Sequence, residues 1–186
     1  MSTNQQSALD VQTLSEFHDQ HGVSLLDRSR QSPVLVVFLR HSGCPFCRQT
    51  LGDLRAHRGK IERTGSKIAL VHMAPAETAG AWFAEYELDD VSRFSDPERV
   101  LYRAFDLHDG SLIQVMGPQT WLRGFKAVVT EGHFFGLPAG HEMQLPGTFL
   151  ILDGRILRAF RHQSSADRPD YADLATCDAA ACRSSS

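Results

Sequence analysis

The chain has 186 residues, with 19 lysines and arginines, 22 aspartates and glutamates and a formal net charge of −3. This length suits one domain with a sizeable core, and the dispersed basic residues argue against binding to nucleic acid or an anionic membrane. The N-terminus lacks the features of a signal peptide, and no apolar run reaches the roughly 18 residues of a membrane span. We therefore expect a cytoplasmic protein, whose four cysteines do not form a structural disulfide framework.

Apolar spacing predicts a β-α-β unit near the start of the chain. Residues 8–17 have helical periodicity, and residues 25–33 are expected to be a polar connection. Residues 34–40 and 67–73 are predicted as buried strands on either side of a helix that spans 44–64. The right-handed crossover that joins such strands makes them parallel.

The middle of the chain is predicted to hold two helices and a long insertion. An amphipathic helix over 76–88 is followed by a short strand over 91–94. Ser95-Asp96-Pro97-Glu98 has the spacing of a capping box and predicts a helix to about residue 107. Glycine-rich residues 109–141 read as an insertion over one face, with a helix from Trp121 to Val129.

The last part of the chain predicts a hairpin and a helix. Strands 148–152 and 156–160 flank the turn Asp153-Gly154-Arg155, and a final helix begins near 167–169. The element order predicts an α/β fold with a mixed central sheet, parallel at first and antiparallel in its last pair, and with helices on both faces.

These elements form a single domain over residues 7–176, with 109–141 as its insertion. Residues 1–6 are expected to be a disordered tail, and residues 177–186, rich in alanine and serine, a flexible one.

Two cysteines stand where the first strand meets the following helix. Cys44 and Cys47 are two residues apart, directly after a short polar elbow. The free amides and the positive end of a helix N-terminus favour the thiolate, which is the reactive form of cysteine. A second cysteine one turn later can close a disulfide and release whatever the first has captured. The pattern therefore predicts a thiol–disulfide site.

Other interpretations of the four cysteines remain open. Cys44 and Cys47 could be two buried thiols, or half of a zinc site completed by Cys177 and Cys182, although that second spacing is loose. The same distal pair could be relay thiols or part of an unimportant tail. We expect no metal.

From Leu39 to Tyr171 the chain resembles the AhpC/TSA-like peroxiredoxin-like family, which includes the peroxiredoxin-like 2 proteins. The resemblance rests on four segments: Phe38-Leu39-Arg40-His41-Ser42-Gly43-Cys44-Pro45-Phe46-Cys47-Arg48, Ser95-Asp96-Pro97-Glu98, Leu145-Pro146-Gly147-Thr148-Phe149 and Ala166-Asp167-Arg168-Pro169-Asp170-Tyr171. It implies a thioredoxin-like three-layer fold with peroxiredoxin-like insertions. It also implies an antioxidant or thiol-oxidoreductase role.

The resemblance assigns substrate contacts as well. Cys44-Pro45-Phe46-Cys47 is similar to the active-site tetrapeptide of glutaredoxins and thioredoxins, so Pro45 and Phe46 would border the substrate. Pro146 matches a proline that is cis in thioredoxin-fold proteins and would expose the backbone of Leu145 to an extended substrate. The alternative is an edge-strand proline that limits the sheet.

The chain departs from both parent families near these cysteines. Peroxiredoxins place a threonine where His41 stands and an arginine where Pro146 stands, and thioredoxins place a buried aspartate where Phe38 stands. His41 is the candidate helper, either lowering the pKa of Cys44 or relaying its proton. A surface-loop histidine is the alternative, and Arg40 could add positive potential.

We therefore expect a thiol–disulfide oxidoreductase in which Cys44 attacks and Cys47 resolves. A peroxidase that passes through sulfenic acid on Cys44 is the second hypothesis, and a non-catalytic redox sensor is the third. No organic cofactor is expected. A thioredoxin or glutathione system would be the reductant, and the sequence leaves open whether the protein forms a homodimer.

Overall fold

The computed structural model describes residues 8–40, 42, 44–109, 144–163 and 167–177. The predicted helix at Trp121–Val129, the tail 1–6 and most of the insertion and C-terminal tail lie outside these ranges. The helices and strands in chain order are α1 (Val11–Glu16), α2 (Leu25–Gln31), β1 (Val34–Phe38), α3 (Pro45–Arg63), β2 (Lys67–His72), α4 (Ala76–Ala84), β3 (Ser92–Ser95), α5 (Val100–Ala104), β4 (Gly147–Leu152), β5 (Arg155–Arg161) and α8 (Tyr171–Leu174).

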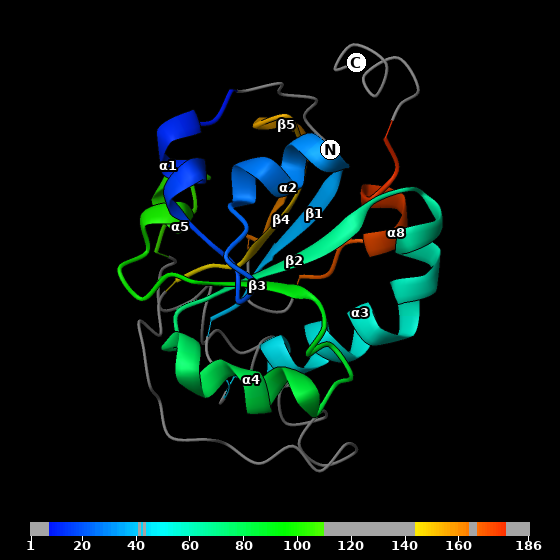
Figure 1. The fold of residues 1–186 in the computed structure, drawn as a ribbon. Coiled ribbons are helices and arrows are strands. Elements are labelled where there is room, and N and C mark those ends of the chain that lie inside the picture. The colour runs from blue at the N-terminus through cyan, green and yellow to red at the C-terminus, as the bar shows by residue number, and fades with distance from the viewer. Residues whose placement is uncertain (1–7, 41, 43, 110–143, 164–166, 178–186) are drawn as a thin grey trace.

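The five strands form one mixed sheet in the order β3-β2-β1-β4-β5 (Figure 1). β1 pairs in parallel with β2, and β2 in parallel with β3. β4 runs antiparallel to β1 and continues into the antiparallel hairpin with β5. The predicted mixed sheet, parallel first and antiparallel in its last pair, is thus confirmed.

Helices cover both faces of the sheet and create two cores. Successive side chains of a strand point to opposite faces of the sheet, so those of β1 contribute to both cores. Val34, Val36 and Phe38 pack on one face, and Leu35 and Val37 pack on the other. The first core includes residues of α1, α2 and α5. The second includes residues of α3, α4 and α8, together with both cysteines of the motif. The predicted three-layer α/β architecture is confirmed.

The segment that was expected to be a polar connection is in fact the helix α2. Ser24 is its N-cap, and its hydroxyl accepts a hydrogen bond from the N–H of Asp27. Leu25, Leu26 and Ser29 are buried. The prediction was wrong because a seven-residue helix carries only one adjacent apolar pair, which is too little periodicity to indicate a helix.

The turn of the β4–β5 hairpin has the conformation that its sequence predicts, and hydrogen bonds to α2 fix its position. Asp153 and Gly154 have φ angles of 49° and 70°, the positive pair that a type I′ turn requires. The Ser29 carbonyl accepts the N–H of Asp153 at 2.8 Å, and the Ser29 hydroxyl accepts that of Gly154 at 3.1 Å. One helix residue therefore fixes both turn residues.

The helix predicted to begin at Ser95 starts later, at Val100, and ends at Ala104. Asp96 is buried, and its carboxylate accepts backbone N–H groups of Val100 and Leu101 at 2.8 Å each. Arg99 has a positive φ of 57°, which interrupts the expected helix. Asp96 caps the helix in place of the predicted serine–glutamate pair.

Gly147, at the start of β4, is the most crowded of the glycines that the structure describes. A Cβ there would lie 2.7 Å from Cδ2 of Leu107 and 2.8 Å from Cε2 of Phe149. We expect Gly147→Ala to lower the free energy of unfolding by about 1–3 kcal/mol, as overpacked cores do. Urea unfolding followed by fluorescence measures this change.

Gly52→Ala is the matched control, because Gly52 lies inside α3 and a Cβ there meets nothing within 4 Å. Alanine favours a helix interior by roughly 0.5–1 kcal/mol over glycine. This variant should be at least as stable as the natural protein, and equal losses at both positions would contradict the packing account.

Candidate active site

Cys44 and Cys47, which form the dithiol of the candidate site, lie between the end of β1 and the first turn of α3. Cys44 is the N-cap of α3, with Pro45 in the first helical position, and Cys47 lies in the first turn. Both cysteines are free thiols, and each is only 3% exposed. Proline suits that first position because its missing N–H would have no partner within the helix. The strand, the turn and the helix thus place the two sulfurs as the sequence predicted.

Cys44 is the more acidic of the two thiols. A hydrogen bond from the Cys47 side chain contributes most to lowering its pKa, to about 6, against burial, which acts in the opposite direction. The positive charge of Arg40 and the backbone N–H groups of Cys47 and Phe46 lower it further. These groups all favour the charged form of the sulfur, so Cys44 is mostly thiolate at neutral pH.

Cys47 has the opposite character. Burial raises its pKa well above the ordinary value, and the hydrogen bond and negative charge of Cys44 raise it further. Its sulfur accepts the backbone N–H of Arg40 at 3.2 Å. The lowered pKa makes Cys44 the more nucleophilic of the two thiols, whereas the raised pKa keeps Cys47 protonated beside it.

Arg40 is the residue that contacts both sulfurs. Its Nη1 atom lies 3.8 Å from the Sγ of Cys44, and its backbone N–H reaches Cys47. The side chain is only 5% exposed, so water screens its charge little. The sequence suggested this arginine only as a source of positive potential. The structure places its guanidinium beside the Cys44 sulfur.

Two buried tyrosines near the dithiol were not anticipated from the sequence. The hydroxyl of Tyr102, in α5, donates to the carbonyl of Leu39, directly before Arg40. Tyr171, in α8, donates to the hydroxyl of Thr50 at 3.4 Å, and burial raises its pKa to about 12. These contacts join positions 63 and 121 residues apart, so no local pattern could indicate them.

The predicted cis peptide before Pro146 is wrong, because the chain contains no cis bond among the residues that are described. Proline tolerates trans at least as well, and cis bonds are the minority before proline. The backbone of Leu145 is also engaged: its N–H donates to His108 at 3.3 Å, and its carbonyl accepts the side chain of Gln144 at 3.1 Å. Both backbone groups of Leu145 thus have a partner within the chain, and a contact of Leu145 with a substrate stays a prediction.

Pro146 nevertheless lies at the same edge of the sheet as the dithiol. Phe38 and Gly147 are the last paired residues of β1 and β4, so Pro146 stands one position beyond them, level with Leu39. Pro146 is buried, and Phe46 is half-buried against the core that contains the cysteines. A substrate contact by Pro45, Phe46 or Pro146 stays a prediction.

No contact in the described part of the chain joins His41, Cys177 or Cys182 to the two thiols of the site. His41 and Cys182 lie outside the described residues. Cys177 is disulfide-bonded, and its partner is neither Cys44 nor Cys47, since both are free. A bonded Cys177 cannot supply the thiolate that the zinc alternative requires. Within the described ranges, no three His, Cys, Asp or Glu side chains gather in a way that could hold a metal ion.

The same ranges contain no helix long and apolar enough to cross a bilayer.

Several known proteins are similar to this chain in sequence or in fold. A prostamide/prostaglandin F synthase of Salmo salar is 26% identical over 159 residues, which are 82% of this chain and 77% of that protein. A bacterioferritin comigratory protein of Xanthomonas campestris matches with a TM-score of 0.62 and 18% identity, over 90% of this chain and 93% of its own. Peroxidoxin BcpB of Mycobacterium tuberculosis matches with a TM-score of 0.59 and 20% identity, over 99% and 97%.

The two solved structures share the thioredoxin-like fold with this chain, as the resemblance implied. The model of the AhpC/TSA family matches residues 5–160, a range that contains both cysteines of the site. The protein is thus a thiol-dependent oxidoreductase in the broad sense that includes peroxidases and disulfide reductases. With most of its length matched, the chain belongs to the AhpC/TSA family.

Proposed function

We propose that this protein is a two-cysteine thiol peroxidase in which Cys44 attacks and Cys47 resolves. The observation that carries the proposal is the division of roles between two adjacent thiols: the pKa of Cys44 is lowered to about 6, and that of Cys47 is raised. A nucleophile must be thiolate, whereas a resolving thiol must keep its proton until the first has reacted.

The cycle has three balanced steps. The Cys44 thiolate attacks one oxygen of a hydroperoxide, the O–O bond breaks, and Cys44 becomes a sulfenic acid while the other oxygen leaves as an alcohol or water after taking up a proton. Cys47 then attacks the Cys44 sulfur and releases water, which forms the Cys44–Cys47 disulfide. External thiols, either the dithiol of a thioredoxin or two glutathione molecules, reduce this disulfide, become oxidised to a disulfide themselves and return both thiols.

Burial of the nucleophile favours a small oxidant. Cys44 is only 3% exposed, and a hydroperoxide can approach such a sulfur with less opening of the protein than a protein disulfide needs. The guanidinium of Arg40, 3.8 Å from the Cys44 sulfur, is available to stabilise negative charge on the leaving oxygen. This role would replace the threonine and arginine that peroxiredoxins use. The related bacterioferritin comigratory protein is described as reducing alkyl peroxides.

Disulfide exchange, the first hypothesis from the sequence, is the alternative. The Cys-x-x-Cys spacing supports it, because a thiolate with a resolving thiol one turn later is also what a disulfide reductase needs. The two functions differ in the first electrophile that Cys44 meets, so they can be separated by kinetics.

We expect reduced protein to react with hydrogen peroxide at least about a hundredfold faster than a free cysteine thiolate, because the site stabilises the leaving oxygen. Stopped-flow tryptophan fluorescence gives the rate, and glutathione disulfide serves as the competing substrate. A peroxide rate equal to that of free thiolate, together with faster reaction with the disulfide, would establish disulfide exchange instead. A single reaction without sustained NADPH consumption in a coupled thioredoxin or glutathione assay would identify a redox sensor.

A further inference from the structure

A cavity of about 320 Å³ opens at the carboxyl ends of β2 and β3. His72 at the end of β2, Arg93 and Ser95 in β3, and Ala76 at the start of α4 are among the residues that line it. In open α/β sheets, ligands bind outside the carboxyl ends of the strands, which makes this edge the expected place for a ligand. The dithiol lies at the same edge of the sheet, beyond the carboxyl end of β1.

Two positive groups face this cavity. Ala76 is the first residue of α4, whose N-cap, Pro75, makes no side-chain hydrogen bond to the helix. The first N–H groups of a helix have no acceptor within it, and they carry the positive end of its dipole. Arg93 adds a full charge. Its Nη1 donates to the carbonyl of Asp89 at 2.8 Å, and within the described chain no carboxylate lies within ion-pair distance of it.

The guanidinium is held against α4. Its Nη2 atom lies 3.6 Å from the position that a Cβ on Gly80 would take, so Arg93 spans from the edge strand to the helix. Arg93 and the first residue of α4, Ala76, both line the cavity. This arrangement suits a ligand with two or more oxygens, which can accept from both.

His72 provides an independent indication of a missing partner. The residue is only 1% exposed, and its Nδ1 atom is buried without a hydrogen-bond partner in the part of the chain that the structure describes. Its ring packs against that of Phe83, with the centroids 5.3 Å apart. Buried ring nitrogens normally have a partner. A ligand oxygen in the cavity that His72 lines would supply one.

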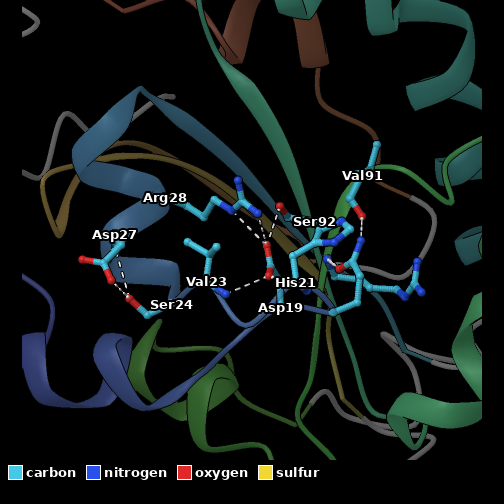
Figure 2. A network of polar contacts seen from close by, with 10 residues as sticks. Asp19, His21, Val23, Ser24, Asp27, Arg28, Val91 and Ser92 are labelled. Atoms are coloured by element: carbon cyan, nitrogen blue, oxygen red, sulfur yellow. Dashed lines mark hydrogen bonds and ion pairs between the residues drawn. The ribbon is translucent and has the colours of Figure 1, made fainter.

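Of the acidic residues near the cavity, Asp19 and Glu16 line it, and Glu77 lies in the first turn of α4. Figure 2 shows that the Asp19 carboxylate is already occupied by Arg28, Ser92 and the backbone N–H of Val23. Glu16 is exposed and accepts the side chain of Gln12. Neither competes directly for Arg93.

We propose that this cavity binds a small oxyanion, a carboxylate or a phosphate, through Arg93, the first N–H groups of α4 and the side chain of His72. The oxyanion could be free in solution or the acidic end of a larger organic molecule. The site uses none of the groups assigned to the dithiol, so it does not depend on the peroxidase proposal.

The test is an NMR titration of the full chain with sodium phosphate, sodium acetate and sodium decanoate, each against sodium chloride at equal ionic strength. We expect saturable changes in the chemical shifts of the Ala76 and Glu77 amides. Arg93→Gln should weaken binding by about tenfold or more, since it removes a charge-assisted hydrogen bond. Arg63→Gln removes an equal charge from the exposed end of α3 and should leave binding unchanged.

Ala76→Pro is a second variant that keeps the test decisive if Arg93→Gln disturbs folding. Proline is well accepted in the first helical position, where it removes only one free N–H, and binding should weaken here too. Binding of acetate or phosphate would identify a free oxyanion, and binding of decanoate alone an organic acid. Equal, non-saturating changes with all salts, or equal losses in Arg93→Gln and Arg63→Gln, would overturn the proposal.

Discussion

Replacing Cys44 with serine is expected to abolish turnover with peroxide and with disulfides, a loss of at least about a thousandfold, because the hydroxyl is not ionised at neutral pH. Replacing Cys47 with serine should have a different effect. Cys44 would still react once, but its sulfenic acid or mixed disulfide would then accumulate, because the resolving thiol is gone. Coupled NADPH consumption measures turnover, and intact-protein mass identifies the trapped species.

Cys177→Ser is the matched cysteine control. Cys177 is bonded to neither thiol of the site, so this variant should keep turnover close to that of the natural protein. Full activity of Cys44→Ser would rule out the assignment of the nucleophile. A large loss of turnover in Cys177→Ser would mean that the distal cysteines relay electrons after all.

The second large effect is expected from Arg40. The hydrogen bond from Cys47 contributes most to lowering the pKa of Cys44 to about 6, and the guanidinium of Arg40, 3.8 Å from the sulfur, lowers it further. In the natural protein the rate of Cys44 alkylation should rise through that pH and level off above it. In Arg40→Gln the midpoint of this pH profile should move upward. Once the midpoint lies above neutral pH, the thiolate fraction at neutral pH falls about tenfold for each further pH unit, and the alkylation rate falls with it, whereas at alkaline pH the rate changes much less.

Two variants distinguish charge from structure at this position. Arg40→Lys keeps a positive charge and should bring the midpoint part of the way back, although it lacks the planar guanidinium. Arg48→Gln removes a nearby arginine whose Nε donates to the carbonyl of Ser42, and no hydrogen bond in the described part of the chain joins it to Cys44, so the midpoint of this variant should stay near that of the natural protein. Thermal unfolding of each variant shows whether the buried charge also stabilises the fold. An unchanged midpoint in Arg40→Gln would contradict the role assigned here.

The parts of the fold that the sequence predicted well are those that depend on local patterns. The buried strand before Cys44, the helix after it and the parallel strand 67–72 follow from apolar runs and chain handedness. The β4–β5 hairpin follows from Asp153-Gly154, because few residue pairs accept two positive φ angles. The two site cysteines were likewise evident from their spacing.

The errors arose where long-range contacts decide the outcome. α2 is stabilised by its cap and by burial against the hairpin turn, not by a periodic pattern. α5 begins late because the buried Asp96 carboxylate caps it. The Leu145–Pro146 bond is trans, where family resemblance suggested cis. Resemblance supplies the matching proline, but the isomer depends on neighbours such as His108, which holds the N–H of Leu145.

The roles of the site residues needed the structure for the same reason. The sequence positions of Arg40, Cys44 and Cys47 do not reveal that one arginine contacts both sulfurs. Its side chain contacts the sulfur of Cys44, and its backbone N–H contacts that of Cys47. The acidity of Cys44 was expected from its position at a helix start. The raised pKa of Cys47 comes first from burial, which the sequence does not reveal.

The central claim is that Cys44 and Cys47 form one working pair. Peptide mass mapping after one equivalent of hydrogen peroxide, with the remaining thiols blocked at once, tests it most directly. Our account predicts that both thiols disappear together and that a Cys44–Cys47 disulfide is the main product. A bridge from Cys44 or Cys47 to Cys177 or Cys182, or oxidation that leaves Cys44 as a free thiol, would contradict it.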